Sequence, residues 1–427
     1  MRKKIYSILM TLAFSAVAFA QSGTNSPYSQ YGLGVLSDQS NGFNRGMNGL
    51  GLGSRTGNQL NFINPASYSA LDSLTFIFDV GLSGQNTNFK EGALRKNAKN
   101  ADFEYATAGF RLFKNLGMSF GIVPFTNVGY NYTETQLLND DSRVRSNQVL
   151  EGIGGVHAIY VGAGWQAFKG FSVGANISYL WGNIERKIAT TYNDESVNSL
   201  SKLYNLDVAS YKLDFGVQYE LPINKKDKLT FGATMSVGHS LNAEPTCDII
   251  TRNPGTGISD TTRYVNASSV ELPFMYGIGV MYNHNNKLDL GFDYSLQQWG
   301  STSFPSYSNG AYTSNDNYYM DRHKFTLGGD YCANKDGRSF FSRLHYRAGV
   351  SYATPYFKVG DKDGPKEISL SAGFGIPVKN LWGNRSIVNI SGQWVHSSAD
   401  GLITENTLRL NIGVTFNERW FMKWKVR

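Results

Sequence analysis

Residues 288–297 read Leu288-Asp289-Leu290-Gly291-Phe292-Asp293-Tyr294-Ser295-Leu296-Gln297, an unbroken alternation of apolar residues with polar or small ones. A period of two is typical of a β-strand whose two faces meet different environments. The same alternation recurs in residues 171–181, 229–237, 368–376 and 408–416. A soluble β-sandwich produces two or three such strands, whereas a membrane barrel needs one apolar and one polar face on every strand. The pattern therefore favours a transmembrane β-barrel.

Extending this pattern along the chain predicts an all-β fold, a transmembrane antiparallel barrel of about 14 strands. The strands are expected at 74–84, 103–114, 116–132, 151–168, 171–188, 202–220, 228–241, 267–282, 287–299, 319–331, 340–353, 366–377, 386–397 and 405–416. Short polar turns such as 114–115 and 169–170 are expected to face the periplasm. The outer loops are expected to be long, at 133–150, 189–201, 242–266, 300–318 and 354–365. Four tryptophans near strand ends fit interfacial aromatic girdles or ordinary packing: Trp165, Trp181, Trp299 and Trp394.

Composition agrees with strands better than with helices. The 427 residues include 26 Phe, 25 Tyr, 7 Trp and 46 Gly, and only 17% are charged. After residue 20 the chain has no apolar run of the roughly 18 residues that a membrane-spanning helix needs. Cys247 and Cys332 are the only two cysteines, and either a disulfide or two free thiols fits their positions.

The first twenty residues predict a signal peptide. Arg2, Lys3 and Lys4 precede an apolar stretch that ends in Ala18-Phe19-Ala20, a signal-peptidase pattern. The mature chain is then expected to start at Gln21 and to reach the outer membrane. Removing residues 1–20 lowers the formal charge from +7 to +4, too little for a nucleic-acid-binding surface, so no nucleic acid partner is expected.

Residues 21–72 do not follow the strand pattern. They contain nine glycines and short, spaced apolar stretches, too few to form a core alone. Spaced anchors such as Tyr28, Leu33 and Phe62 suggest packing against another surface. The expected organisation is an N-terminal hatch at 21–72 inside the lumen, a barrel over 73–416 and a basic, aromatic periplasmic tail at 417–427.

Several short motifs resemble the long-chain fatty acid transporter (FadL-like) family of outer-membrane proteins. They are Arg45-Gly46-Met47-Asn48-Gly49-Leu50-Gly51, the hatch motif Asn64-Pro65-Ala66, Gly121-Ile122-Val123-Pro124-Phe125, and Glu271-Leu272-Pro273 with Asp293-Tyr294 and Trp299. The resemblance implies a fourteen-stranded barrel with an amino-terminal hatch. Both termini, Ser26 to Gly32 and Asn417 to Lys425, resemble a branch of the family found in Bacteroidetes and differ from the better-studied transporters.

Pro124 is the residue in the third expected strand that carries a physical argument. Proline removes a ladder donor and is excluded from central strands unless the strand is kinked or bulged. Pro124 with Phe125 is therefore expected to mark a gap in the wall, and the resemblance implies that such a kink is a lateral opening. The alternative is a harmless position at the barrel rim.

Two functions follow from these expectations. The first is passive uptake of a hydrophobic small molecule resembling a long-chain fatty acid, with hatch gating and lateral release into outer-membrane lipids. The second is a barrel subunit of an outer-membrane secretion or protein-insertion complex, a role that the resemblance gives to Bacteroidetes relatives. In either case no cofactor is expected.

Catalysis is the third function considered, and the chain is expected not to be an enzyme. His396 and Ser398 share one face of a strand, as in an outer-membrane phospholipase, but the surrounding residues of such a site are not recognisable. The histidines His157, His239, His323 and His345 are too dispersed to indicate a metal site.

Overall fold

A computed structural model describes residues 23–137, 144–194, 196–266, 270–308, 310–379 and 385–418. The expected signal peptide and most of the expected tail lie outside these residues. In the parts of the chain that the structure describes, no helix is long and apolar enough to cross a membrane.

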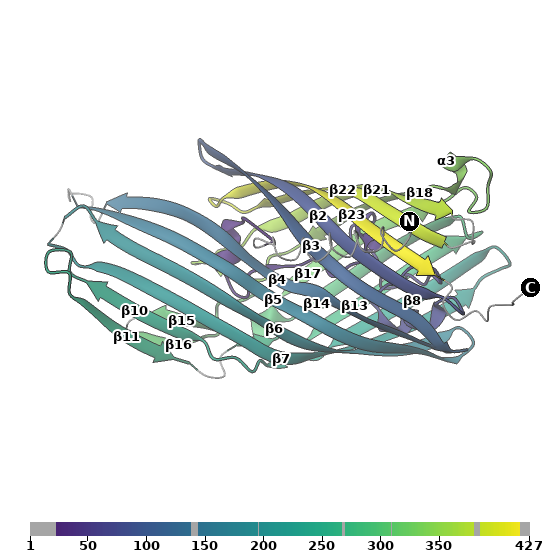
Figure 1. Cartoon of the computed structure of the whole chain (residues 1–427), viewed down its shortest axis with the longest axis horizontal. Helices are drawn as coiled ribbons and strands as arrows, with labels where there is room; N and C mark the ends of the chain where they lie inside the picture. The colour runs from purple at the N-terminus through teal and green to yellow at the C-terminus, as the bar shows by residue number, and fades with distance from the viewer. Residues whose placement is uncertain are drawn as a thin grey trace, which may run out of the picture.

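Fourteen antiparallel strands form a closed barrel (Figure 1), as the alternation predicts. They are β2 (Phe76–Glu91), β3 (Leu94–Phe113), β4 (Leu116–Leu137), β5 (Arg145–Phe168), β6 (Phe171–Tyr192), β7 (Ser199–Pro222), β8 (Asp227–Ser236), β13 (Met275–His284), β14 (Leu288–Gln297), β17 (Arg322–Tyr331), β18 (His345–Ala353), β21 (Lys366–Lys379), β22 (Arg385–Ser398) and β23 (Thr404–Glu418). Each pairs with the next, and the ladder from Phe76↔Glu418 to Lys90↔Thr404 closes β2 onto β23.

The remaining elements lie inside the barrel or at its ends. The hatch contains η1 (Pro27–Gln30), β1 (Val35–Leu36), α2 (Gly42–Arg45) and η2 (Pro65–Ala70). The outer loops contain β9 (His239–Ser240), β10 (Thr246–Arg252), β11 (Ser259–Val265), β12 (Glu271–Leu272), η3 (Trp299–Ser301), β15 (Phe304–Ser308), β16 (Ala311–Asn315), β19 (Lys358–Val359) and β20 (Lys362–Asp363). The short helix α3 (Phe340–Arg343) precedes β18.

Several expected boundaries were wrong. The segments expected as loops at 133–150 and 189–201 are largely strand, because β4 to β7 continue far beyond the lipid-facing part and pair with one another to their tips. The strand expected at 267–282 begins only at Met275, and the one expected at 340–353 opens with α3. Within 242–266, β10 adds to the outer part of β7 and forms a hairpin with β11.

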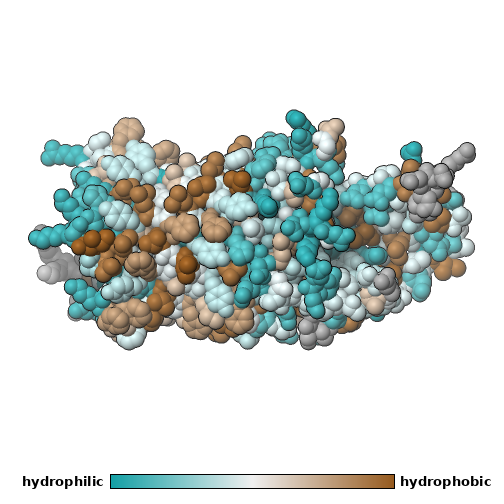
Figure 2. Space-filling view, turned by 180° about the vertical axis from the view of Figure 1, so that it is seen from behind, coloured by the Kyte–Doolittle hydropathy of each residue, from teal (hydrophilic) through white to brown (hydrophobic). Residues whose placement is uncertain are grey.

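The two faces of the wall differ as the alternation predicts. On the outer face of β14, Leu290 and Phe292 are 48% and 41% exposed. Asp293, on the inner face of the same strand, is 7% exposed. Figure 2 shows apolar side chains gathered over one half of the outer surface, the half that lies at the right of Figure 1. The far ends of β4 to β7 project from the opposite end, beyond the half that carries most of the apolar side chains (Figure 1).

Trp299 does not belong to an interfacial aromatic girdle, and the alternative of ordinary packing applies to it. Trp165 is 51% exposed and lies on the outer face, but Trp299 is fully buried. It packs between Tyr319 and Tyr356, with ring centroids 5.2 and 5.1 Å away. Its role is internal packing at the outer mouth.

The cysteines are unpaired. Cys247 in β10 and Cys332 just after β17 are both buried and free. The disulfide alternative is therefore not the one that the structure adopts.

Candidate functional site

The hatch is seated on a row of wall glycines. Gly117, Gly164, Gly174 and Gly216 pair directly across β4, β5, β6 and β7. A Cβ at Gly117 would lie 1.9 Å from the carbonyl oxygen of Tyr68, and one at Gly174 would lie 2.4 Å from the carbonyl carbon of Pro65. Any larger residue would therefore collide with hatch backbone. The row leaves the space that η2 fills.

The motif Asn64-Pro65-Ala66 starts η2 against this row. The side chain of Asn64 caps the helix by accepting from Ala66 N at 3.1 Å. Its Nδ2 donates to Leu52 O at 3.0 Å and to Val217 O in β7 at 3.1 Å. Asn64, Pro65 and Ala66 are all buried. Asn64 thus joins two parts of the hatch to the wall.

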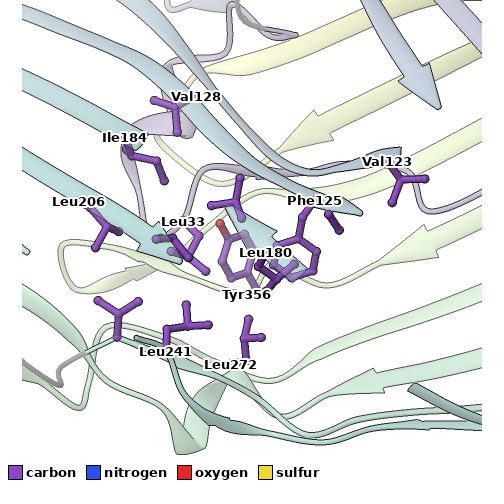
Figure 3. Packing of buried hydrophobic residues seen from close by; sticks show 14 of the residues in the cluster. Leu33, Val123, Phe125, Val128, Leu180, Ile184, Leu206, Leu241, Leu272 and Tyr356 are labelled. Carbon is purple, nitrogen blue, oxygen red and sulfur yellow. The ribbon is translucent and has the colours of Figure 1, made fainter. Parts of the chain in front are cut away.

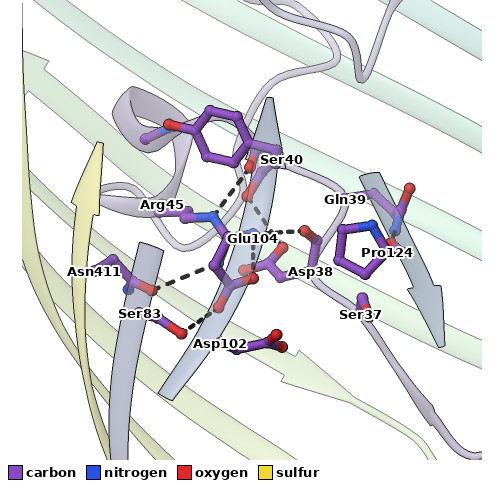
Figure 4. A network of polar contacts seen from close by, with 12 residues as sticks. Ser37, Asp38, Gln39, Ser40, Arg45, Ser83, Asp102, Glu104, Pro124 and Asn411 are labelled. Carbon is purple, nitrogen blue, oxygen red and sulfur yellow. Dashed lines mark hydrogen bonds and ion pairs between the residues drawn. The ribbon is translucent and has the colours of Figure 1, made fainter. Parts of the chain in front are cut away.

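A buried polar network holds the hatch to β3, the strand next to this row (Figure 4). Arg45 forms an ion pair with Glu104 in β3, and Nε of Arg45 donates to Ser40 O at 3.0 Å. Burial alone would lower the pKa of Arg45, but Glu104 and Asp38 raise it. Burial would likewise raise the pKa of Asp38, but Lys324 and Arg45 lower it. Both pKa shifts favour the charged forms of these hatch residues.

An aromatic cluster closes the outer mouth over the hatch. Tyr31 stacks on Phe357 with ring centroids 5.1 Å apart. Gly32 N donates to the Tyr318 hydroxyl at 3.1 Å, and the Tyr356 hydroxyl donates to Gly34 O. Tyr356 lies among apolar residues from the hatch, β4 to β7 and the mouth loops (Figure 3). The outer part of the lumen is therefore a packed core.

The lumen keeps a small cavity lined by both charged and apolar side chains. Its volume is about 350 Å³, and charged side chains line it, including Lys212, Asp214, Arg322, Lys324 and Glu367. Arg322 and Glu367 form an ion pair at 2.9 Å. Phe62, Phe125 and Met275 line the same cavity, so an apolar ligand there would lie against both apolar and charged groups.

Pro124 lies at a β-bulge in the middle of β4. It pairs with His157 of β5, and the register shifts between Pro124 and Thr126. The carbonyl oxygen of Pro124 accepts from Gln39 Nε2 at 2.6 Å (Figure 4), and the buried Phe125 joins the inner apolar core (Figure 3). The bulge therefore contacts the hatch directly.

The ladder between β3 and β4 ends two residues before Pro124, at Ala106↔Ile122. Beyond it lies a groove of about 1920 Å³. Apolar residues from the strands on both sides of the split line this groove, including Phe103, Ile122, Ile153 and Trp181. This groove is larger than the cavity in the lumen.

The residues considered for catalysis do not form a recognisable site. His396 Nδ1 lies 2.8 Å from Asn406 Oδ1 across β22 and β23, and its ring stacks on Trp394. Ser398 ends β22, opposite Lys366. Within the described ranges no three His, Cys, Asp or Glu side chains are grouped to hold a metal ion.

Sequence reasoning missed the parts of the hatch that act on the wall. Arg45 was visible only as part of a motif, and its partner Glu104 lies in β3, 59 positions away. The wall glycines carried a signal, since Gly164 and Gly174 flank the short turn at 169–170 at nearly equal distances. Such symmetry places both in one row of a hairpin.

Solved structures share this architecture. The toluene transporter TodX of Pseudomonas putida aligns with a TM-score of 0.60 and 15% identity, over 92% of this chain and 100% of that chain. A FadL homologue of Pseudomonas aeruginosa aligns with a TM-score of 0.60 and 13% identity, over 90% and 99%. The toluene transporter TbuX of Ralstonia pickettii aligns with a TM-score of 0.59 and 14% identity, over 90% of this chain and 98% of that chain. At these identities the likeness shows the fold alone.

Comparisons by sequence give a different result. No curated protein matches the chain. A family model described as BamG matches residues 1–427.

Proposed function

Because this chain belongs to the BamG family, we propose that it is a non-transport barrel subunit of the outer-membrane protein-insertion (Bam) assembly. In this proposal the barrel resides in the outer membrane, and its partners are other proteins of that assembly and outer-membrane lipids. Its FadL-like fold serves as a scaffold.

The hatch that fills the lumen is the observation that carries this proposal. The aromatic cluster around Tyr31 and Tyr356 packs against the hatch at the mouth, and the remaining cavity of about 350 Å³ includes charged groups in its lining. The hatch is held to β7 by Asn64 and to β3 by Arg45. Opening a path for a hydrophobic molecule would require breaking both attachments and burying apolar surface against charges. A rigid filled barrel fits a scaffold better than a channel.

Purification of the tagged chain from the outer membrane in which it is made tests this proposal. We expect stable recovery with barrel-insertion proteins, and we expect depletion to lower the folded amount of other outer-membrane barrels. A monomer that is recovered alone, with no effect of depletion on other barrels, contradicts the proposal.

A second candidate function, uptake of a hydrophobic small molecule, is favoured by the groove beside Pro124. Its apolar lining of about 1920 Å³ has room for a lipid-like molecule, and the split in the wall would release that molecule sideways. Here the hatch would have to move. Measuring uptake of a radiolabelled long-chain fatty acid in cells with and without the chain separates the candidates: uptake that depends on the chain supports transport, and unchanged uptake supports the scaffold.

A further inference from the structure

The split between β3 and β4 leaves two strand edges facing each other. On one bank, β2 and β3 stay paired up to Glu91↔Leu94. On the other, β4 and β5 stay paired up to Leu137↔Arg145. The pairing between the banks stops at Ala106↔Ile122, so the outer halves of β3 and β4 do not pair with each other. Figure 1 shows the β2–β3 hairpin rising away from β4.

The hatch already adds a strand to one of these edges. Val35 and Leu36 of β1 pair antiparallel with Asn127 and Thr126 of β4. Ser37 N donates to Phe125 O at 3.0 Å, which continues the contact toward the bulge. The edge of β4 therefore has the geometry that accepts a strand.

The hatch covers this edge only in part. Gly129 N donates to the Ser29 side chain at 3.1 Å, and β1 has no paired residue beyond Asn127. The outer part of β4, residues 131–137, extends past this contact. Within the described residues, β4 has ladder partners only in β1, β3 and β5. An extended edge of this kind is a template for another chain.

We infer that the split binds an extended segment of a partner protein, which adds as a strand to the outer edge of β4 beyond β1. This inference rests on the proposed function and names the place where the partner docks. The segment has apolar side chains on the face that meets Ile153 and Trp181, and small or polar ones on the luminal face. A lipid chain would fill the apolar groove but cannot form hydrogen bonds with a strand edge. A peptide strand provides apolar side chains for the groove and backbone hydrogen bonds for the edge.

The direction of the amides in β4 gives a sharp test. Gly129 N–H points toward the hatch, and successive amides of a strand point to opposite sides, so the amides of Thr133 and Thr135 point into the split. Thr133→Pro removes one backbone amide donor from the edge of β4 and keeps the hydrogen bonds between β4 and β5. Thr133→Val keeps the donor and changes only the side chain.

The readout is site-specific photocrosslinking in the cells that make the protein. Benzoylphenylalanine replaces Ile153, which lines the groove and is 61% exposed, or Ile278 of β13, a lipid-facing control that is 60% exposed. We expect a protein adduct at position 153 that maps to an extended segment, and lipid adducts at position 278. Thr133→Pro should lower the protein adduct at least fivefold, and Thr133→Val should leave it unchanged. Thr135→Pro replaces Thr133→Pro if the latter does not migrate as a folded barrel.

Three outcomes overturn the inference: only lipid adducts at position 153, equal protein adducts at both positions, or an adduct that neither proline affects. If the assembly is still recovered in those cases, the proposed function stands and the docking site is elsewhere. If the chain is recovered alone, the proposed function fails as well.

Discussion

Nη2 of Arg45 lies 2.9 Å from Oε2 of Glu104, and both side chains are buried. Arg45 ends α2 in the hatch, and Glu104 belongs to β3 in the wall. Ser83 of β2 donates to the other carboxylate oxygen of Glu104 at 2.5 Å. One ion pair thus ties the hatch to the strand that borders the split, so that retention of the hatch and the position of this wall are linked.

Arg45→Met should destabilise the barrel. It leaves Glu104 buried without its cation, a change that typically costs about 3 to 5 kcal/mol of unfolding free energy. The double variant Arg45→Met/Glu104→Gln removes both charges and should recover part of the loss. Urea unfolding followed by heat-modifiable gel mobility measures the difference. Equal stability of the single variant and the parent chain would show that the pair does not hold the hatch.

Gly174→Ala should unseat η2. The new Cβ would overlap the Pro65 carbonyl, and overpacking of this kind costs about 1 to 3 kcal/mol. Gly84→Ala on the outer face of β2 is the matched control, since a Cβ there has no atom within 4 Å. We expect faster protease cleavage within residues 23–72 of folded Gly174→Ala and no change in the control. Identical cleavage in both variants would contradict the packing of η2 against the wall glycines.

Asn64→Asp should weaken the hatch while keeping its helix cap. An aspartate still accepts from Ala66 N, but it cannot donate to Leu52 O and Val217 O. A lost donor to buried carbonyls costs roughly 1 to 3 kcal/mol. Labelling of a single cysteine placed at Ser67 in intact cells should rise with Asn64→Asp. Full protection of that cysteine would mean that the wall glycines alone retain the hatch.

Pro124→Val distinguishes the two candidate functions. Valine supplies an amide donor and favours strands, so the ladder between β3 and β4 should lengthen and the split should narrow. Under the scaffold proposal fatty acid uptake stays unchanged, whereas under the transport candidate it falls. If the variant folds poorly instead, the bulge is required by its contact with Gln39.

The strand number and the two faces of the wall could be predicted because both depend on local alternation. Leu290 and Asp293 show this, since side chains of one strand reach opposite environments whatever the rest of the barrel does. The hatch was predictable only as a segment without a core of its own. The seat of Asn64 was not, because it depends on Gly216 and Val217, more than 150 residues further along the chain.

The outer parts of β4 to β7 were missed for a related reason. Segments such as 133–150 are rich in polar residues because both of their faces lie outside lipid. Apolar residues therefore no longer alternate with polar ones there, and the strand pattern is lost from the sequence. They remain strands because β4, β5 and β6 each pair with the next strand over twenty or more residues, which no local pattern records.

Closure of the barrel through β2 and β23 has a consequence for the order of folding. The fifteen residue pairs of that ladder join positions more than 300 residues apart, so the ladder can form only after the whole chain has been made. The hatch is bonded to both β3 and β7, so its final packing depends on strands that are far apart in the chain. Nonlocal closure of this kind is slow. During that interval β2 and β23 each expose a free edge, and a free strand edge is open to pairing with other chains until the last ladder forms.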